Sequence, residues 1–185
     1  MTTELERLSR AVSHALRHRP ESYGIELDVE GWVSIQDLLE GIHKLDPSFM
    51  DVKEDDLKRM IHASSKVRHE IEGGRIRALY GHSLDGHITK VEAEPPEHLF
   101  HGTSPEAWLE IKTVGLLPMS RQYVHLSVDV ATAWQVGRRK SPRPVVLTAR
   151  AKDSFKSGES FWIGNQTVWL AKHVRPEFLA VVATT

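Results

Sequence analysis

The chain has 185 residues, and 40% of them are hydrophobic, which is enough to form a core in one domain or in two small lobes. Its 24 lysines and arginines against 25 aspartates and glutamates give a formal net charge of −1, which excludes a general cationic field, so any phosphate-binding site must be local. The lack of cysteine excludes disulfides and thiolate chemistry, and no apolar run suits a signal peptide or a membrane span, so we expect a cytoplasmic protein with no membrane partner.

The first half of the sequence predicts three helices followed by a β-hairpin. Apolar residues at helical spacing indicate a helix over residues 3–18, which must end near Pro20 because proline disfavours helix in the preceding residue. The other expected elements are a strand at residues 32–33, helices at residues 34–43 and 54–64, and strands at residues 67–71 and 75–80 around Gly73 and Gly74. This order is typical of a winged-helix domain, which we place at residues 1–90.

Two basic clusters in this half each allow two interpretations. Arg17 and His18 fall at the C-terminal end of the first helix, where they could interact with the helix dipole or, with Arg19 beside Pro20, grip a phosphate. Arg68 is predicted on the strand face opposite its neighbours Val67, His69 and Ile71. A charged residue there is normally solvated unless a ligand docks on it.

The second half predicts a mostly β lobe with two helices at residues 97–185, after a proline- and glutamate-rich linker at residues 88–97. Ser104 and Pro105 are typical of a helix start, and Gly115 suits the end of that helix. The other expected elements are strand-like runs at residues 99–103 and 121–127, a helix at residues 130–136, and strands at residues 145–149, 161–163, 168–170 and 178–182.

A histidine lies in each of the strand-like runs, His101 in the first and His125 in the second. Either residue alone could as well be a satisfied core histidine. Together with Arg121 they favour one shared pocket for a polar, anionic ligand, and Gly102 would let that ligand approach the backbone closely. His98 and His101 lack a further ligand group at suitable spacing, so we expect no zinc site.

Six motifs occur in the order found in one known family: Leu16-Arg17-His18-Arg19-Pro20, Lys66-Val67-Arg68, Ile76-Arg77-Ala78 with Gly81-His82-Ser83, His101-Gly102-Thr103, Gly115-Leu116 with residues 121–127, and Val168-Trp169-Leu170. Together they resemble the NAD-dependent RNA 2′-phosphotransferases of tRNA splicing, over nearly the whole chain. The resemblance implies an α+β fold, with a winged-helix RNA-binding lobe joined to an ADP-ribosyltransferase-like NAD lobe.

The resemblance also implies a reaction in two steps. An internal 2′-phosphate of RNA attacks the nicotinamide riboside carbon of NAD, and nicotinamide leaves. The resulting 2′-phospho-ADP-ribosylated RNA then gives RNA with a 2′-hydroxyl and ADP-ribose 1″,2″-cyclic phosphate. NAD is thus a co-substrate, no metal is required, and we expect a monomer.

Site residues follow from the resemblance position by position. Its catalytic set corresponds to Arg17, His18, Arg68 and Arg121. The residues that would bind NAD are His101, Gly102, Thr103, His125, Leu126, Ser127 and Val168, and those that would bind the RNA 2′-phosphate are Arg17, His18, Lys66, Arg68, His82 and Ser83. The chain departs from the family pattern at His69, Leu79, Tyr80 and Tyr123, outside the catalytic set.

The residue chemistry agrees with this reaction, because guanidinium groups bind phosphate oxygens bidentately and an imidazole can move a proton near neutral pH. His18 is the candidate for that proton transfer. One alternative is an ADP-ribosyltransferase that leaves ADP-ribose on a terminal phosphate of RNA or DNA. Another is a non-catalytic winged-helix protein that binds nucleic acid, which the near-neutral charge and the two histidines disfavour.

Overall fold

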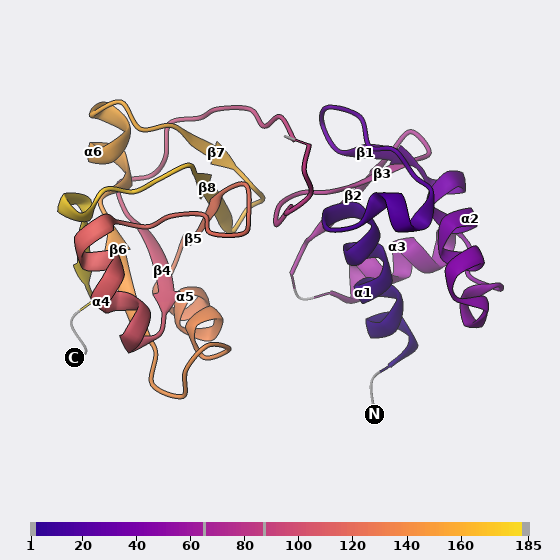
Figure 1. Cartoon of the computed structure of the whole chain (residues 1–185), viewed down its shortest axis with the longest axis horizontal. Coiled ribbons are helices and arrows are strands. Elements are labelled where there is room, and N and C mark those ends of the chain that lie inside the picture. Colours follow the sequence, from indigo (N-terminus) through magenta and orange to yellow (C-terminus); the bar gives the residue numbers. More distant parts are fainter. Residues whose placement is uncertain (1–2, 65, 87, 183–185) are drawn as a thin grey trace. The chain divides into compact units, whose positions relative to one another are not determined.

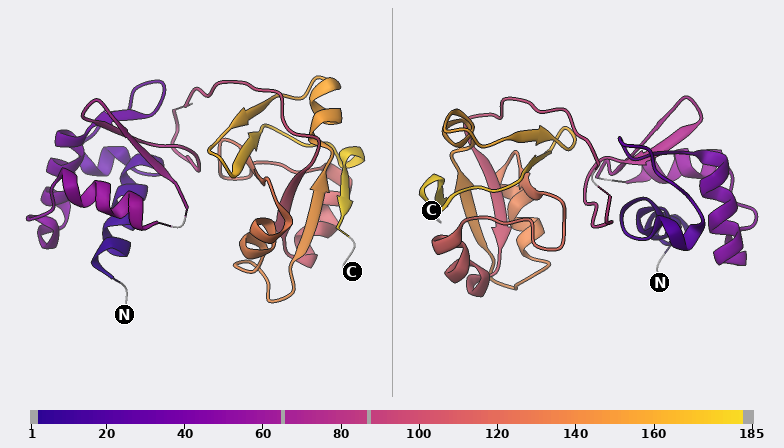
Figure 2. Two further views of the ribbon diagram at one scale, coloured as in Figure 1. Left: turned by 180° about the vertical axis from the view of Figure 1, so that it is seen from behind. Right: turned by 45° about the horizontal axis from the view of Figure 1, so that its top comes forward.

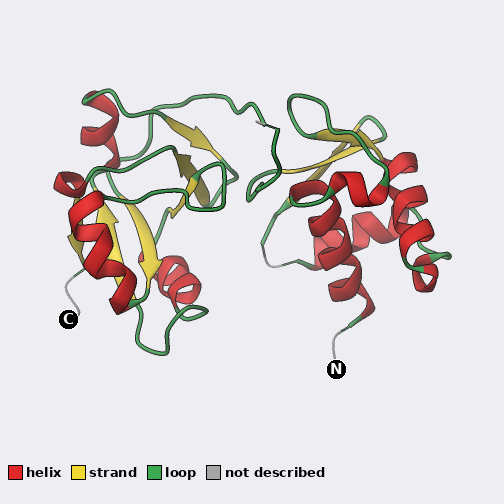
Figure 3. Ribbon diagram, viewed as in Figure 1, coloured by secondary structure: helices red, strands yellow, loops and turns green. Residues whose placement is uncertain are grey.

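A computed structural model describes residues 3–64, 66–86 and 88–182 (Figure 1). The chain forms two compact units, Met1–Thr89 and Lys90–Thr185, which we describe separately. Both combine helices with an antiparallel sheet, so the fold class is α+β (Figure 3). Within the described ranges, no helix has the length and apolar character needed to cross a membrane.

Unit 1 is a set of helices with a small sheet in the order β1-β3-β2. Its elements are α1 (Glu4–Arg17), the 3-10 turn η1 (Pro20–Tyr23), β1 (Trp32–Ser34), α2 (Ile35–Leu45), the 3-10 turn η2 (Pro47–Phe49), α3 (Glu54–Ala63), β2 (His69–Glu72) and β3 (Arg75–Ala78). The three predicted helices are therefore confirmed. Leu8, Val12 and Leu16 of α1 are buried in one core with residues of α2, α3 and β3.

Local signals explain where these helices begin. Thr3 and Glu6 form a capping box, in which the Glu6 amide donates to Thr3 Oγ1 at 3.2 Å and the Thr3 amide donates to Glu6 Oε2 at 2.9 Å. Ser34 caps α2 by accepting from the Asp37 amide at 2.9 Å.

The hairpin differs from the prediction at both ends. Strand β2 begins at His69, so Val67 and Arg68 precede it, and Val67 is exposed whereas His69 is buried. The Ser64 hydroxyl donates to the Lys66 carbonyl at 2.8 Å and accepts from the Lys66 amide at 3.3 Å, which ties Lys66 to the end of α3. Strand β3 ends at Ala78, three residues before Gly81, whose φ is +92°.

Unit 2 is built on one antiparallel sheet in the order β7-β8-β5-β4-β6-β9. Its elements are β4 (Leu99–Thr103), α4 (Pro105–Val114), β5 (Val124–Ser127), α5 (Val130–Gly137), β6 (Val145–Ala149), α6 (Ala151–Lys156), β7 (Phe161–Ile163), β8 (Val168–Ala171), the 3-10 turn η3 (Pro176–Phe178) and β9 (Leu179–Val181). Helices α4 and α5 lie on opposite faces of this sheet (Figure 2).

Two features of unit 2 were not predicted. Helix α6 adds a third helix, so the prediction of two helices was wrong. It follows β6 after a single residue, Arg150, which makes no side-chain capping bond and so leaves no helix-start signal in the sequence. The last strand begins at Leu179, because Phe178 belongs to η3.

The predicted linker at residues 88–97 is largely structured. Ile88 is buried, and the Thr89 amide donates to the Val29 carbonyl at 2.8 Å within unit 1. Glu92 pairs with Trp162 of β7, and the Ala93 amide donates to the Phe161 carbonyl at 2.9 Å within unit 2. These bonds lie on both sides of the boundary between the units, which falls between Thr89 and Lys90.

Candidate functional site

Unit 1 brings together the end of α1 and the segment that follows β3. Helix α1 ends at Arg17, and His18 is its C-cap. The His18 Nδ1 atom lies 2.8 Å from Ser83 Oγ, and the Ser83 amide donates to the Arg17 carbonyl at 2.9 Å. Three predicted site residues from two distant segments therefore meet, with the His18 ring exposed.

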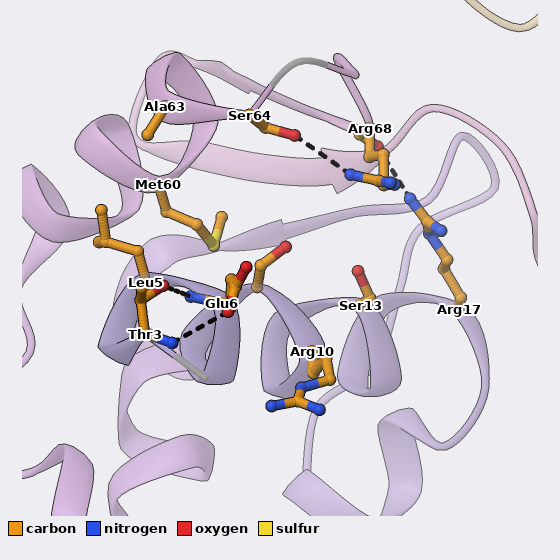
Figure 4. Close-up of a pocket in the computed structure, with 11 residues that line it drawn as sticks. Thr3, Leu5, Glu6, Arg10, Ser13, Arg17, Met60, Ala63, Ser64 and Arg68 are labelled. Atoms are coloured by element: carbon orange, nitrogen blue, oxygen red, sulfur yellow. Dashed lines mark hydrogen bonds between the residues drawn. The ribbon is translucent and has the colours of Figure 1, made fainter. Parts of the chain in front are cut away.

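Arg68 lies beside Arg17 on the same side of unit 1 (Figure 4). The Arg68 guanidinium donates to Ser64 Oγ at 3.1 Å, and Arg17 Nη2 donates to the Arg68 carbonyl at 3.4 Å. The Arg17 guanidinium also lies over the Tyr80 ring, 5.4 Å from its centroid. Hydroxyl, carbonyl and aromatic groups thus orient the two arginines close together.

His69 lies beneath this pair as a buried, neutral residue. Its Nε2 atom is 3.2 Å from Ser13 Oγ. Burial, and then the positive charges of Arg17 and Arg68, lower the pKa of His69 to about 3. The predicted site residue His82 is also buried, 2% exposed, so it lies below the surface that His18 and Ser83 reach.

Unit 2 contains a cavity of about 530 Å³ where β4 and β5 separate. In the described structure these strands share a single residue pair, Phe100 with Ser127, although β4 pairs with β6 along all five of its residues. Beyond that pair the strands diverge. The cavity is lined by both strand histidines, His101 and His125, and by Thr103, Arg121, Tyr123, Lys140 and the loop after α4.

Each of the two histidines has a defined hydrogen-bonding role. His101 Nδ1 lies 2.9 Å from the His125 carbonyl oxygen, which can only accept, so Nδ1 carries the proton. The His101 ring is partly exposed, and the surrounding atoms still lower its pKa to about 4, mainly by burial, so it is neutral at pH 7. Arg121 Nη1 lies 2.7 Å from His125 Nδ1 and can only donate, so Nδ1 of His125 carries no proton in this arrangement.

The cavity is also suited to an anion. Arg121, Arg139 and Lys140 line it, and burial and the charge of Arg121 lower the pKa of Lys140. Glu110 is the one acidic residue among the described lining residues. The buried Thr103 hydroxyl, 1% exposed, has no hydrogen-bond partner in the described structure, so a polar group of a ligand could satisfy it.

Four predicted NAD-binding residues do not line this cavity: Gly102, Leu126, Ser127 and Val168. The close approach at Gly102 is made by α5, since a Cβ there would lie 1.8 Å from the Ala133 carbonyl oxygen. Gly102 therefore lets α5 pack closely against β4, and close ligand approach to its backbone stays a prediction. Leu126 belongs to the core, and the buried Ser127 pairs with Val168 across β5 and β8.

Sequence reasoning passed over Arg139 and Lys140. The run of three cations at residues 138–140 was the available signal, but only the chain path after α5 brings its last two members to the cavity. Tyr123 also lines the cavity and is held by Trp162, with ring centroids 5.0 Å apart. Arg17, His18 and Arg68 belong to unit 1, and Arg121 belongs to unit 2.

Comparison with known proteins agrees with the motifs. The profile described as "RNA 2′-phosphotransferase, Tpt1 / KptA family" matches residues 3–173. A probable RNA 2′-phosphotransferase of Bacillus thuringiensis subsp. konkukian is 49% identical over 174 residues, which cover 94% of each chain. Proteins with the same name from Acetivibrio thermocellus and Escherichia coli O8 are 47% and 42% identical, over 95% of this chain and 96% and 95% of their own lengths. The chain therefore belongs to the RNA 2′-phosphotransferase, Tpt1 / KptA family.

Proposed function

We propose that this protein is an NAD-dependent enzyme that removes an internal 2′-phosphate from RNA and transfers it to ADP-ribose. The observation that carries the proposal is the unit 2 cavity, which combines two histidines of defined tautomer, the unpartnered Thr103 hydroxyl and the cations Arg121 and Lys140. Such a cavity suits a ligand with a diphosphate and polar ribose and amide groups, as NAD has. Family membership supports the RNA 2′-phosphate as the second substrate.

In the first step, a 2′-phosphate oxygen attacks C1″ of the nicotinamide riboside while the C1″–N bond breaks and nicotinamide leaves. This is mainly a positioning task. His101, Thr103 and His125 would hold the NAD. The Nε2 atom of neutral His101 would accept a hydrogen bond from it, and the Nε2–H group of His125 would donate one. Arg121, which donates to His125, would bring a positive charge to the phosphate.

In the second step, the 2″-hydroxyl attacks phosphorus and the bond to the RNA 2′-oxygen breaks. That oxygen takes a proton, and the 2″-hydroxyl loses one. Arg17 and Arg68 would bind the phosphate oxygens, since Arg17 Nη2 reaches the Arg68 carbonyl and Ser64 orients the Arg68 guanidinium beside it. The exposed His18, oriented by Ser83, would move the proton.

The fold supports the same division of labour. The three helices and hairpin of unit 1 are the elements that a winged-helix RNA-binding lobe requires, and we assign unit 1 that role. Unit 2, in whose sheet β4 and β5 share one residue pair, would be an ADP-ribosyltransferase-like NAD lobe.

The decisive experiment is incubation of the protein with NAD and an oligonucleotide that carries one internal 2′-phosphate. We expect RNA with a 2′-hydroxyl, nicotinamide and ADP-ribose 1″,2″-cyclic phosphate, identified by chromatography and mass spectrometry. ADP-ribose that remains on a terminal phosphate of the RNA would favour the alternative transferase. Release of inorganic phosphate without NAD would contradict the proposal.

A further inference from the structure

A groove along α1 leads away from Arg17 and Arg68, and the proposed reaction leaves it unused. The groove has a volume of about 720 Å³ and lies between α1 and the end of α3 with the segment that follows it (Figure 4). Arg17 and Arg68 lie at one end, and Thr3 lies at the other. A ligand bound at the two arginines could therefore extend along the helix.

The polar side of α1 forms one wall of the groove. The residues of α1 that line it on this side are Glu6, the adjacent Ser9 and Arg10, Ser13 and Arg17, so that each step from one turn to the next is three or four residues. Because an α-helix has 3.6 residues per turn, these residues share one side of α1, while the buried residues of the same helix face the core. The pattern that builds the core of unit 1 therefore also places hydroxyl and guanidinium groups in a line that ends at Arg17.

Arg10 differs from most arginines of unit 1. Arg7 pairs with Asp46, Arg75 with Asp28 and Arg77 with Glu70. Arg10 is exposed, and within the described residues no carboxylate lies within ion-pair distance of it. It thus offers the groove a positive charge that no acidic residue of the described chain neutralises.

The acidic residue on the groove, Glu6, lies toward the far end, where its carboxylate accepts from the Thr3 amide. The stretch from Arg10 to Arg17 and Arg68 is therefore the cationic part. Its facing wall includes Met60 and Ala63, which offer apolar surface, and Ser64, which holds Arg68 in place. Cations, a hydroxyl at Ser9 and apolar surface together suit a nucleotide chain, which has phosphates, sugars and flat bases.

We propose that this groove binds the nucleotides that flank the 2′-phosphate on one side, with Arg10 contacting a backbone phosphate and Ser9 a phosphate or sugar oxygen. The inference rests on the proposed function, since it takes the 2′-phosphate to lie at Arg17 and Arg68. Seven residues separate Arg10 from Arg17, about 10.5 Å along the helix. A stacked strand advances about 3.4 Å per nucleotide, so the site would hold about three nucleotides, or fewer if they are extended.

The test measures binding of three ligands in the absence of NAD, by competition against a fluorescent 2′-phosphorylated RNA. The ligands are adenosine 2′-phosphate and two RNAs whose 2′-phosphorylated nucleotide carries three more nucleotides, on the 5′ side in one and the 3′ side in the other. Arg10→Gln should raise the Kd of one extended RNA about two- to fivefold, the range of an exposed ion pair, and should leave adenosine 2′-phosphate unchanged. The slope of log Kd against log salt concentration for that RNA should also fall by about 0.7, the value for one lost phosphate contact on a single strand.

Two control variants test whether the effect depends on the positive charge at residue 10 and on its place in the groove. Lys44→Gln removes one exposed cation from α2, outside the groove, and should change no Kd. Arg10→Lys keeps the charge and should restore most of the affinity for the extended RNA. If Arg10→Gln weakens all three ligands equally, or none, the groove does not bind flanking nucleotides.

The parent protein supplies the remaining checks. If neither extended RNA binds more tightly than adenosine 2′-phosphate, the inference is overturned, whatever the enzyme does with NAD. If the extended RNA binds as expected but NAD yields no loss of its 2′-phosphate, the proposed function fails while the groove assignment stands.

Discussion

The two units orient their arginines with different kinds of acceptor. In unit 1, Arg17 donates to a backbone carbonyl and Arg68 to the Ser64 hydroxyl, groups that do not titrate near neutral pH. In unit 2, Arg121 donates to His125 Nδ1, and that bond exists only while this nitrogen is unprotonated. The hydrogen bond that holds Arg121 is therefore coupled to the proton on a neighbouring ring, whereas the bonds from Arg17 to the Arg68 carbonyl and from Arg68 to Ser64 are not.

The two units also differ in where each places a neutral histidine. His69 in unit 1 bonds a serine hydroxyl beneath the arginines, and His101 in unit 2 bonds the backbone at the edge of the cavity. Both are neutral at pH 7 because burial lowers their pKa values. Unit 1 thus keeps its neutral imidazole apart from the exposed one at His18, while in unit 2 the neutral imidazole itself lines the ligand cavity.

The largest expected effect comes from removing the candidate catalytic side chains of unit 1. Arg17→Ala, His18→Ala or Arg68→Ala should slow the second step about 100- to 1000-fold, the usual cost of a lost donor where charge develops. Because the first step depends mainly on how NAD is held, 2′-phospho-ADP-ribosylated RNA should accumulate. Single-turnover assays with labelled RNA would reveal it.

The matched variants for that assay lie in unit 2. The double variant His101→Ala, His125→Ala should instead weaken NAD binding and show no intermediate. If the unit 1 variants also slow product formation with no intermediate band, the two units do not act in different steps.

A second prediction concerns how closely α5 packs against β4 in unit 2. Gly102→Ala places a methyl group on the Ala133 carbonyl, so β4 and α5 must move apart, and the free energy of unfolding of unit 2 should fall by about 3 kcal/mol. Among the described residues, a methyl group in Gly86→Ala of unit 1 would meet the Leu84 side chain, at an ordinary contact distance of 3.5 Å, and the change should be nearly neutral. Denaturant unfolding followed by hydrogen exchange resolves each unit. A stable Gly102→Ala protein would mean that α5 packs more loosely than described.

The third prediction is an acid sensitivity located in unit 1. The pKa of His69 is about 3 in the folded chain and near the ordinary 6.5 when unfolded, so its contribution to stability is complete above pH 6.5 and is lost as the pH falls toward 3. By pH 5 the loss should be about 2 kcal/mol. His69→Phe should flatten this dependence for unit 1, as measured by unfolding between pH 7 and pH 5. An unchanged slope would show that His69 is protonated easily in the folded state.

Two comparisons sharpen that measurement. His62→Gln changes an exposed histidine of α3 and should leave the slope as it is in the parent. The dependence in unit 2 should persist in His69→Phe, because the pKa of His101, about 4, gives a separate loss of stability between pH 6.5 and pH 4.

The smallest expected effect is at the start of α1. Thr3→Ala removes the capping hydroxyl and should lower the stability of unit 1 by about 1 kcal/mol, with no change in unit 2. Thermal unfolding would measure it, and Thr3→Ser should behave as the parent. A loss in unit 2 of equal size would show that the two units unfold together.

The sequence was most informative where the determinant is local. The helices α1, α2 and α4 carry their own capping residues, Thr3, Ser34 and Ser104, and were predicted within a few residues. Helix α6 has no such residue. The role of Gly102 depends on α5, about 30 residues later in the chain, and the position of Lys140 depends on how the chain turns between α5 and β6, so neither could be inferred from nearby residues.

The hydrogen bonds on both sides of the boundary between the units have a consequence for engineering the chain there. The Thr89 amide is bonded within unit 1, and the Ala93 amide is bonded within unit 2. The closure entropy of a flexible connection grows slowly with its length, by about 0.6 kcal/mol for each doubling. Glycine and serine residues inserted between Thr89 and Glu92 should therefore cost little, and should leave the bonds at Thr89 and Ala93 and both hydrophobic cores as they are.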